Sequence, residues 1–253
     1  MCLRLFKKAA ENPFLQEAPI ILKKLFLDAF FPQYCLACGK EGDIVCSDCL
    51  SVIDVSERLF CPFCVHPVPV EKGKCFRHRQ MNLDGLFAAA SYQDPLVQIM
   101  VKKMKYEPFL KELKKPLSQL IIAHFLLTES KLRKQSLLVP VPLASRSRRK
   151  RGFNQAEEIC RELAAFFSVP VLSKGLLKIK ETPKQAGLNR ADRISNVNGV
   201  FMAGRPGAVK GKNVYLVDDV FTTGATMEEC ARVLKSAGAK EVWGVAVARE
   251  VLS

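Results

Sequence analysis

One segment, Val214–Met227, constrains the possible folds of this chain more than any other. Its first four residues, Val214–Val217, are apolar and predict a short, buried parallel strand. Two acids, Asp218 and Asp219, come directly after this strand, and a turn rich in small and hydroxyl residues follows them. This order of strand, acids, turn and helix predicts a phosphate-binding βα unit in an α/β domain.

The turn supplies the groups that bind a phosphate. It consists of Thr222, Thr223, Gly224, Ala225 and Thr226. A helix is expected from Thr226 to about Ala237, with Gly238 at its C-cap, and its N-terminal amides would face the anion. An ordinary βα turn is the alternative. The two adjacent carboxylates argue against it, because at a buried strand end they repel and need ribose hydroxyls, Mg²⁺ or another partner.

A second pattern consists of four pairs of metal-binding residues, each pair separated by two positions. Eight such donors predict two closed, four-coordinate, structural zinc sites. The expected grouping joins neighbouring pairs. One site then takes Cys35, Cys38, Cys46 and Cys49, and the other takes Cys61, Cys64, Cys75 and His78. A crossed grouping, and His66 as a competing donor, stay open at this point.

The positive charge of the chain is concentrated in one segment. The 253 residues carry a formal net charge of +14, and Met100–Arg151 alone has 14 Lys and Arg against 3 Asp and Glu, a net of +11. Such a segment suits a polyanion, either nucleic acid or pyrophosphate. The alternative is a solvated basic face. An apolar content of 49% is enough for a sizeable core in one α/β domain with a small accessory module.

The N-terminal segment does not resemble a secretory signal, because lysines and an aspartate interrupt its apolar runs. Ala18–Phe31 has the spacing of an amphipathic helix instead, and no apolar run reaches the ~20 residues of a transmembrane helix. Paired cysteines in such a chain indicate metal binding in a reducing, cytoplasmic environment.

A second candidate anion site follows Leu137–Pro142, which is expected to be a strand that ends at its prolines. The site is a basic run, expected to form a loop before Gly152. Its cations are Arg146, Arg148, Arg149, Lys150 and Arg151. In open α/β sheets ligands bind at the carboxyl ends of the strands, which is where this run is expected to lie. A basic surface loop without a ligand is the alternative.

The remaining periodic segments complete an alternation of strands and helices. Leu86–Tyr92 and Val242–Ala248 predict strands, and Pro95–Tyr106 and Leu113–Thr128 predict helices. His124, on the second of these helices, is expected to be a core histidine with a hydrogen-bond partner.

The Val214–Met227 segment resembles the phosphoribosyl pyrophosphate (PRPP) motif of type I phosphoribosyltransferases. Val139–Leu143 and Arg151–Gln155, on either side of the basic run, are similar to segments of the ComF family. This family comprises phosphoribosyltransferase-like proteins of bacterial DNA uptake and their relatives. The order of motifs matches from about residue 31 to residue 249, with one departure, because Ser147 stands where the family usually carries a cation.

The resemblance implies roles for the candidate residues. Asp218 and Asp219 would hold the ribose 2′- and 3′-hydroxyls, Thr222–Thr226 would cradle the 5′-phosphate, and the pyrophosphate would lie towards Arg146–Arg151.

The resemblance also implies a loop that closes over the ligand. Lys180–Gly187 resembles the mobile loop of type I phosphoribosyltransferases, and Lys180 and Gln185 are its candidate catalytic side chains. A plain exposed loop is the alternative.

The expected architecture is therefore an α/β fold, a type I phosphoribosyltransferase-like open, mostly parallel sheet. An amphipathic helix and a double zinc ribbon in residues 1–84 would precede this domain, which would occupy residues 85–253. The two anion sites would meet at the carboxyl edge of the sheet.

Three functions compete at the level of sequence. The first is a protein that binds PRPP with Mg²⁺ and handles incoming single-stranded DNA in natural transformation, beside a helicase-like or other DNA-uptake protein. The second is an active phosphoribosyltransferase that transfers ribose 5-phosphate to an unidentified base or amine. The third is a scaffold whose zinc ribbon binds another protein.

Overall fold

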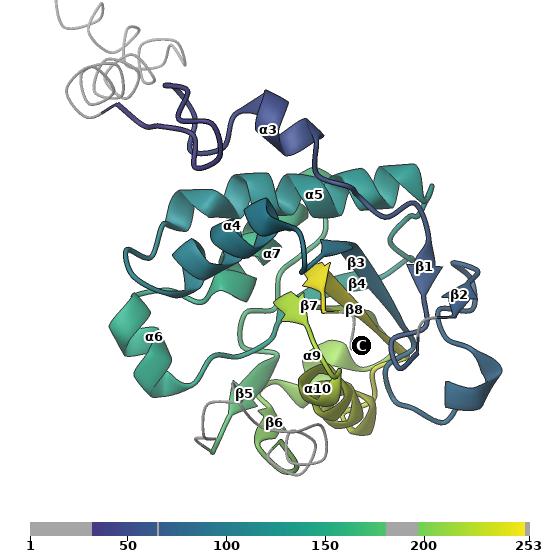
Figure 1. Ribbon diagram of the computed structural model, residues 1–253. Coiled ribbons are helices and arrows are strands. Elements are labelled where there is room, and N and C mark those ends of the chain that lie inside the picture. The colour runs from purple at the N-terminus through teal and green to yellow at the C-terminus, as the bar shows by residue number, and fades with distance from the viewer. Residues whose placement is uncertain (1–31, 65, 181–196, 251–253) are drawn as a thin grey trace, which may run out of the picture. The chain divides into compact units, whose positions relative to one another are not determined.

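The computed structural model describes residues 32–64, 66–180 and 197–250 (Figure 1). The expected helix at Ala18–Phe31 and most of the expected loop at Lys180–Gly187 lie outside these residues. The chain divides into two compact units, Met1–Ser51 and Val52–Ser253. The boundary between the compact units, after Ser51, therefore lies earlier in the chain than the domain boundary expected after residue 84. The second cysteine cluster lies in the same unit as the main sheet.

The larger unit is built on a four-stranded parallel sheet. Its strands, in spatial order, are β3 (Gly85–Ser91), β8 (Glu241–Arg249), β7 (Asn213–Phe221) and β4 (Ser136–Pro140). The two central strands are buried along most of their length, as their continuous apolar sequences predict for a sheet covered on both faces. This arrangement confirms the parallel sheet expected from the sequence.

Helices cover both faces of this sheet. The helices α4 (Pro95–Lys105), α5 (Lys114–Leu127) and α7 (Gln155–Phe167) lie above it in Figure 1, and α10 (Ala225–Ser236) lies below it. The helix α4 begins as its sequence predicts, because the Asp94 side chain accepts hydrogen bonds from the amides of Leu96 and Val97.

The remaining elements of the two units are short. They are α3 (Ser47–Ser51), β1 (Leu59–Phe60), β2 (Pro67–Val68), α6 (Ser145–Arg151), β5 (Leu176–Lys178), β6 (Phe201–Ala203), α9 (Pro206–Val209) and the 3₁₀ turns Phe76–His78 and Lys111–Leu113. The pairs β1–β2 and β5–β6 are antiparallel.

The end of β7 differs from the sequence-based expectation. The strand continues through Asp218 and Asp219 to Phe221, because β8 pairs with it over that whole length. On the other side β4 pairs only as far as Pro140, opposite Val217. The acids therefore lie inside a strand, at the point where its neighbour β4 has ended and left one side of β7 open.

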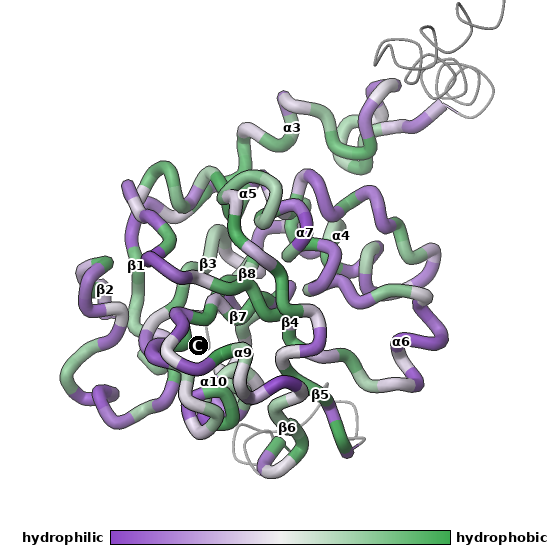
Figure 2. Tube along the Cα trace, turned by 180° about the vertical axis from the view of Figure 1, so that it is seen from behind, coloured by the Kyte–Doolittle hydropathy of each residue, from purple (hydrophilic) through white to green (hydrophobic). Residues whose placement is uncertain are grey.

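The basic run also differs from expectation, since Ser145–Arg151 is the helix α6 and not a loop. Arginine and lysine are good helix formers, and Gly152 closes the helix in a left-handed conformation, with φ of 79°. Figure 2 shows the core strands in the colour of hydrophobic residues, and the core cluster around β7, β8 and α10 includes Leu216, Val242 and Cys230. Within the described residues, no helix combines the length and apolar character needed to cross a membrane.

Candidate functional site

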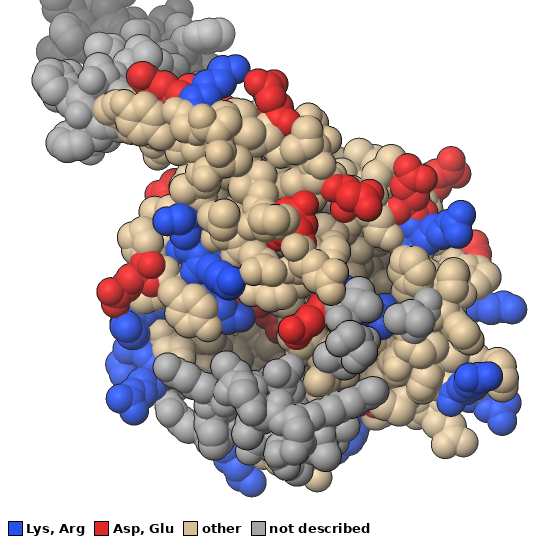
Figure 3. All heavy atoms as spheres, in the orientation of Figure 1, with Lys and Arg blue, Asp and Glu red and all other residues tan. Residues whose placement is uncertain are grey.

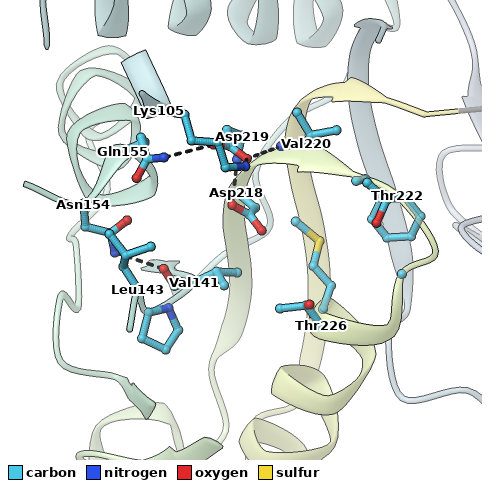
Figure 4. A pocket seen from close by; sticks show the side chains of 14 residues that line it. Lys105, Val141, Leu143, Asn154, Gln155, Asp218, Asp219, Val220, Thr222 and Thr226 are labelled. Carbon is cyan, nitrogen blue, oxygen red and sulfur yellow. Dashed lines mark hydrogen bonds and ion pairs between the residues drawn. The ribbon is translucent and has the colours of Figure 1, made fainter. Parts of the chain in front are cut away.

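A pocket of about 210 Å³ opens beside the exposed end of β7, at the carboxyl edge of the parallel sheet. Figure 4 shows its walls, with the β4–α7 region on one side and the β7–α10 turn on the other. Its lining residues are Lys105, Val141, Pro142, Leu143, Asn154, Gln155, Asp218, Asp219, Val220, Phe221, Thr222, Gly224, Thr226 and Met227. Both expected anion regions thus contribute to one pocket, though the second contributes through Asn154 and Gln155 and not through its cations.

The carboxylate of Asp219 is held by three donors. Lys105 Nζ lies 3.2 Å from its Oδ1, Gln155 Nε2 donates to its Oδ2 at 3.3 Å, and the amide of Val220 donates to Oδ1 at 2.8 Å. Asp219 is only 5% exposed, so this ion pair lies largely out of water. The Asp219 carboxylate in turn raises the pKa of Lys105 above its usual value. Asp219 therefore has a defined position and a fixed counter-charge before any ligand arrives.

Asp218 has a different environment, although it is the next residue in the strand. Its side chain points into the pocket in Figure 4, and its Oδ1 accepts a hydrogen bond from the amide of Asp219 at 2.8 Å. Burial, together with the neighbouring Asp219 charge, raises the pKa of Asp218 to about 7. Asp218 therefore takes up or releases a proton near neutral pH, as expected of a carboxylate that needs a cation or hydroxyl partner to stay ionised.

The turn after β7 has the geometry of an anion-binding loop. Gly224 has φ of 80° and precedes the first residue of α10, and the first turn of that helix lines the pocket through Thr226 and Met227. The N-terminus of a helix favours an anion beside it. A side chain at Gly224 would meet the ring of Phe221 at 2.7 Å, so only glycine fits there. Thr222 and Thr226 line the pocket beside it. Thr223 and Ala225 belong to the same turn but are not among the lining residues, and the amide of Ala225 donates to Thr223 Oγ1 at 3.4 Å.

The cations of α6 lie outside the pocket lining. Arg148 is paired with Glu157 at 3.4 Å and Lys150 with Glu107 at 3.2 Å, and Arg146 and Arg149 are exposed. The helical conformation accounts for this arrangement, because successive side chains of a helix point in different directions around its axis.

Arg151, at the end of α6, lies within electrostatic reach of Asp219. Its Nε and Nη1 atoms are buried and have no hydrogen-bond partner within the described part of the protein. Burial lowers the pKa of its guanidinium, and the Asp219 and Tyr106 side chains act in the opposite direction. A buried guanidinium with unsatisfied donors is a group that an anionic ligand would satisfy.

Of the two candidate catalytic residues, Lys180 and Gln185, the structure describes only Lys180. Lys180 follows β5, with its Nζ beside Gly199 at the β5–β6 hairpin, and is not among the pocket lining. Gln185 lies outside the described residues. Lys178, two positions earlier, is close enough to Asp218 to lower the pKa of that carboxyl.

The residue of the pocket that sequence reasoning missed is Lys105. It belongs to α4, and 114 positions separate it from Asp219. The only indication in the sequence that this residue belongs to a site was the cluster of lysines at the end of the helix predicted at Pro95–Tyr106. Asn154 and Gln155 had a signal in the motif at Arg151–Gln155, and Asn154 caps α7 by accepting a hydrogen bond from the amide of Ala156.

The metal-binding residues form two separate clusters, one in each compact unit. Within each cluster all four donor atoms lie within 4.8 Å of one another. The clusters are Cys35, Cys38, Cys46 and Cys49, and Cys61, Cys64, Cys75 and His78. These are the neighbouring pairs, and the histidine in the second cluster is His78 rather than His66.

The spacing of these atoms fits zinc. The Sγ atoms of Cys38 and Cys46, and those of Cys64 and Cys75, are 3.7 Å apart. His78 Nδ1 lies 3.2 Å from the sulfur of Cys75. A tetrahedron with Zn–S bonds of about 2.3 Å has edges of about 3.8 Å, so one ion fits the centre of each cluster. Four protein donors at each ion indicate structural zinc, as the sequence predicts.

Two domain families match the chain. Residues 149–250 match the phosphoribosyl transferase domain, and residues 26–78 match the double zinc ribbon domain. With the parallel sheet and the two cysteine clusters, these matches define a phosphoribosyltransferase-like protein with an N-terminal double zinc ribbon.

Relatives along nearly the whole chain define the family. Competence protein F of Haemophilus influenzae is 27% identical over 233 residues, which cover 86% of this chain and 98% of that protein. The DNA utilization protein YhgH of Escherichia coli K12 is 30% identical over 214 residues, covering 82% and 91%. Competence protein ComFC of Streptococcus pneumoniae is 34% identical over 122 residues, covering 48% and 52%. The chain belongs to the ComF family, and it is a phosphoribosyltransferase-like protein.

A solved structure also matches part of the chain. The glutamine PRPP amidotransferase of Bacillus subtilis, determined with ADP and GMP, is 25% identical with a TM-score of 0.33, and the match covers 54% of this chain and 25% of that one. The match spans a quarter of that longer protein.

Proposed function

We propose that this protein binds PRPP together with Mg²⁺ in the pocket beside β7, and that it acts in bacterial DNA uptake by handling incoming single-stranded DNA. The observation that carries the proposal is the pocket itself. One small cavity combines an anion-binding turn at the start of α10, two acids in β7, and one cation, Lys105, which is paired with the second acid.

Each part of PRPP has a matching group. The turn with Thr222 and Thr226 suits the 5′-phosphate, since hydroxyls and helix amides donate to it. Asp218, which points into the pocket beside the buried charge of Asp219, suits the ribose hydroxyls or the Mg²⁺ that accompanies PRPP. Lys105 and Arg151 suit the pyrophosphate, because both are partly buried cations near the acids. Mg²⁺ would neutralise part of the ligand's negative charge.

The DNA-handling part of the proposal rests on the basic surface around α6 and on the relatives. Figure 3 shows blue side chains at the position of α6. Arg146, Arg148 and Arg149 are exposed there, and Tyr106, at the end of α4, is 57% exposed. Cations with an exposed aromatic ring suit the phosphates and bases of a single strand. The printed names of the relatives, "competence protein" and "DNA utilization protein", support a role in DNA uptake. A helicase-like or other uptake protein is the proposed partner.

A phosphoribosyltransferase reaction is the second candidate. It is favoured by Lys178, which is close enough to Asp218 to lower the pKa of that carboxyl. In this reaction the ribosyl C1–pyrophosphate bond breaks, pyrophosphate leaves with the bonding electrons, and a base or amine forms the new bond to C1. Lys180 and Gln185 are the proposed side chains at the reacting centre. Release of pyrophosphate only when an acceptor is added is the result that distinguishes this function from binding alone.

The variant Gly224→Ala tests the pocket. The new Cβ would meet the Phe221 ring at 2.7 Å in a backbone conformation that disfavours alanine, so the turn must shift. In the wild type, Mg²⁺ with PRPP should raise the melting temperature, because a ligand that binds the folded state stabilises it. In Gly224→Ala this increase should be largely lost.

Gly207→Ala is the matched control. A Cβ at Gly207 has no neighbour within 4 Å and the residue has no positive φ, so the response to PRPP should equal that of the wild type. An equal response from all three proteins would mean that PRPP does not bind at this turn.

A further inference from the structure

The second zinc cluster and the anion-binding turn lie in the same compact unit, and one side chain contacts elements of both. Arg249 is the last residue of β8 and is partly buried. Its Nη2 donates to the carbonyl oxygens of Pro62 at 3.2 Å and Cys64 at 3.1 Å. Both acceptors belong to the knuckle Cys61–Cys64, which supplies two ligands of the second cluster. Zinc would hold this knuckle, and therefore the two acceptors of Arg249, in place.

On its other side Arg249 contacts the floor of the anion-binding turn. Its guanidinium carbon lies 5.8 Å from the centre of the Phe221 ring, and the two residues are register partners in β7 and β8. The amide of Glu250 donates to the Phe221 carbonyl at 2.8 Å, which ties the two strand ends together. Phe221 is 2% exposed, and its ring fills the space that a side chain at Gly224 would need. The position of this ring therefore decides where the turn can lie.

A second contact joins the knuckle to the same core. Phe63, between the two cysteines of the knuckle, packs against the core cluster that includes Phe221 and Met227. Its ring centre is also 5.5 Å from that of the ligand His78. The knuckle thus packs on the core that contains Phe221 through an apolar side chain, in addition to the hydrogen bonds from Arg249.

We propose that Arg249 is a positioning residue that makes the anion-binding turn depend on zinc in the second cluster. Zinc fixes the position of the Cys61–Cys64 knuckle, and the carbonyl oxygens of the knuckle fix the guanidinium of Arg249. Arg249 in turn fixes the position of the Phe221 ring against Gly224. The consequence for PRPP rests on the proposed function. The consequence for the turn itself does not, since it concerns the ligand-free protein.

The variant Arg249→Met tests this coupling in the full-length, zinc-loaded protein. Methionine keeps an apolar side chain beside Phe221 but removes both hydrogen bonds to the knuckle. Hydrogen exchange of the ligand-free protein should become at least severalfold faster at the amides of residues 221–227. The dissociation constant for PRPP with Mg²⁺ should rise by roughly five- to tenfold, as expected for loss of hydrogen bonds from a charged group. Zinc content, measured by atomic absorption, should stay at two ions.

Two controls separate this role from general destabilisation. Arg133→Met removes another arginine that stacks on an aromatic ring of β8, 4.7 Å from the centre of Trp243, and it should leave exchange at residues 221–227 unchanged. Cys49→Ser removes a ligand of the first cluster, which belongs to the other compact unit, and it should also leave this exchange unchanged. Cys64→Ser, in the second cluster, should accelerate it.

The outcomes are distinguishable. If Arg249→Met exchanges like the wild type at residues 221–227 and binds PRPP equally well, the inference is overturned and the proposed function stands. If the wild type does not bind PRPP, the proposed function fails, and the exchange experiment still decides whether the turn depends on the second zinc site. The inference would also be overturned if Arg133→Met accelerated exchange at residues 221–227 as much as Arg249→Met does.

Discussion

Two adjacent acids in β7 differ in what surrounds them. Asp219 is held by Lys105, Gln155 and a backbone amide, whereas Asp218 points into the pocket and accepts a hydrogen bond from the amide of Asp219. Residues next to one another in a strand point to opposite faces, which explains how one pair of acids divides between two environments. The ligand contact that depends most on pH is therefore expected at Asp218.

Binding of PRPP with Mg²⁺ should tighten as the pH rises through about 7. The pKa of Asp218 is raised to about 7 by burial and by the Asp219 charge, so the carboxyl is protonated below that pH and ionised above it. The ionised form is the one that binds Mg²⁺ or accepts from a hydroxyl. Calorimetric titrations between pH 6 and 8.5 should therefore give an affinity that rises by about tenfold and then levels off.

Asp218→Asn is the control for this dependence, because PRPP also titrates near pH 6. The variant should bind about 10- to 100-fold more weakly, and its remaining affinity should show only the ligand's own pH dependence. The same steepness in the variant and the wild type would exclude Asp218 as the titrating group.

His124 should make the fold sensitive to mild acid. It is 1% exposed, its Nδ1 lies 2.6 Å from the Ser56 carbonyl oxygen, and its Nε2 has no hydrogen-bond partner within the described residues. It is therefore only half satisfied, in contrast to the expectation from sequence. Burial lowers the pKa of His124, so the unfolded state binds a proton more readily below about pH 6.5. The free energy of unfolding should fall as the pH drops from 7 to 5.

Urea unfolding of the wild type and His124→Gln measures this contribution. The variant cannot take up the proton, so its curve of stability against pH should be flatter over this range. The two proteins share every other titratable group, so the contributions of those groups cancel in the comparison. Parallel curves would contradict the assignment.

At the scale of single residues, the sequence predicted part of the site. Asp218, Asp219 and the threonines were recognisable because the strand, acids and turn are contiguous. Lys105 was not, because its position beside Asp219 depends on how α4 packs, over a separation of 114 residues. Within the described residues, Arg151 Nε and Nη1 are buried without a hydrogen-bond partner. Burial of this kind cannot be read from a basic run in the sequence.

At the scale of elements, α6 shows how secondary structure redistributes charge. The sequence predicted five cations in one loop facing one anion. The helix separates them, so Arg151 lies near the acids, Arg148 pairs with Glu157, and Arg149 is exposed. Part of the +11 charge of this segment is also balanced by acids outside it, for example where Lys114 pairs with Glu162 at 2.9 Å.

The exposed arginines of α6 should contribute to single-stranded DNA binding in a salt-dependent way. Arg146→Gln with Arg149→Gln should weaken binding, and the slope of log affinity against log salt should become shallower by about 1.4, because each phosphate contact on a single strand contributes about 0.7. Fluorescence anisotropy with a labelled oligonucleotide of mixed sequence measures both quantities.

Arg205→Gln with Lys210→Gln is the matched control. It removes the same charge from exposed positions flanking α9, and it should change the slope much less. Equal slopes for the two double variants would indicate a diffuse effect of net charge and would contradict a DNA path along α6.

The boundaries of elements followed the sequence where periodicity and capping agreed. The helix α4 is bounded by Asp94 and Tyr106, close to prediction, because a cap and a proline mark its start. The end of β7 was misjudged because pairing with β8, and not the apolar run, decides where the strand stops.

At the scale of the whole molecule, the order of strands β3, β8, β7 and β4 brings together residues that are distant in the chain. The alternation of strands and helices predicted a parallel sheet, but not which strands are neighbours. The same holds for the second zinc cluster. Its ligand spacing was visible in the sequence, whereas its contact with β8 through Arg249 depends on the packing of the complete unit.

The central claim is that the pocket beside β7 binds PRPP with Mg²⁺. Its most direct test is a calorimetric titration of PRPP with Mg²⁺ into the zinc-loaded protein and into the double variant Asp218→Asn, Asp219→Asn. Asp84→Asn is the control, because Asp84 is an ion-paired acid of the same unit outside the pocket. Saturable binding to the wild type and to Asp84→Asn, lost in the double variant, is the predicted result. No saturable binding to the wild type, or equal binding to the double variant, would contradict the claim.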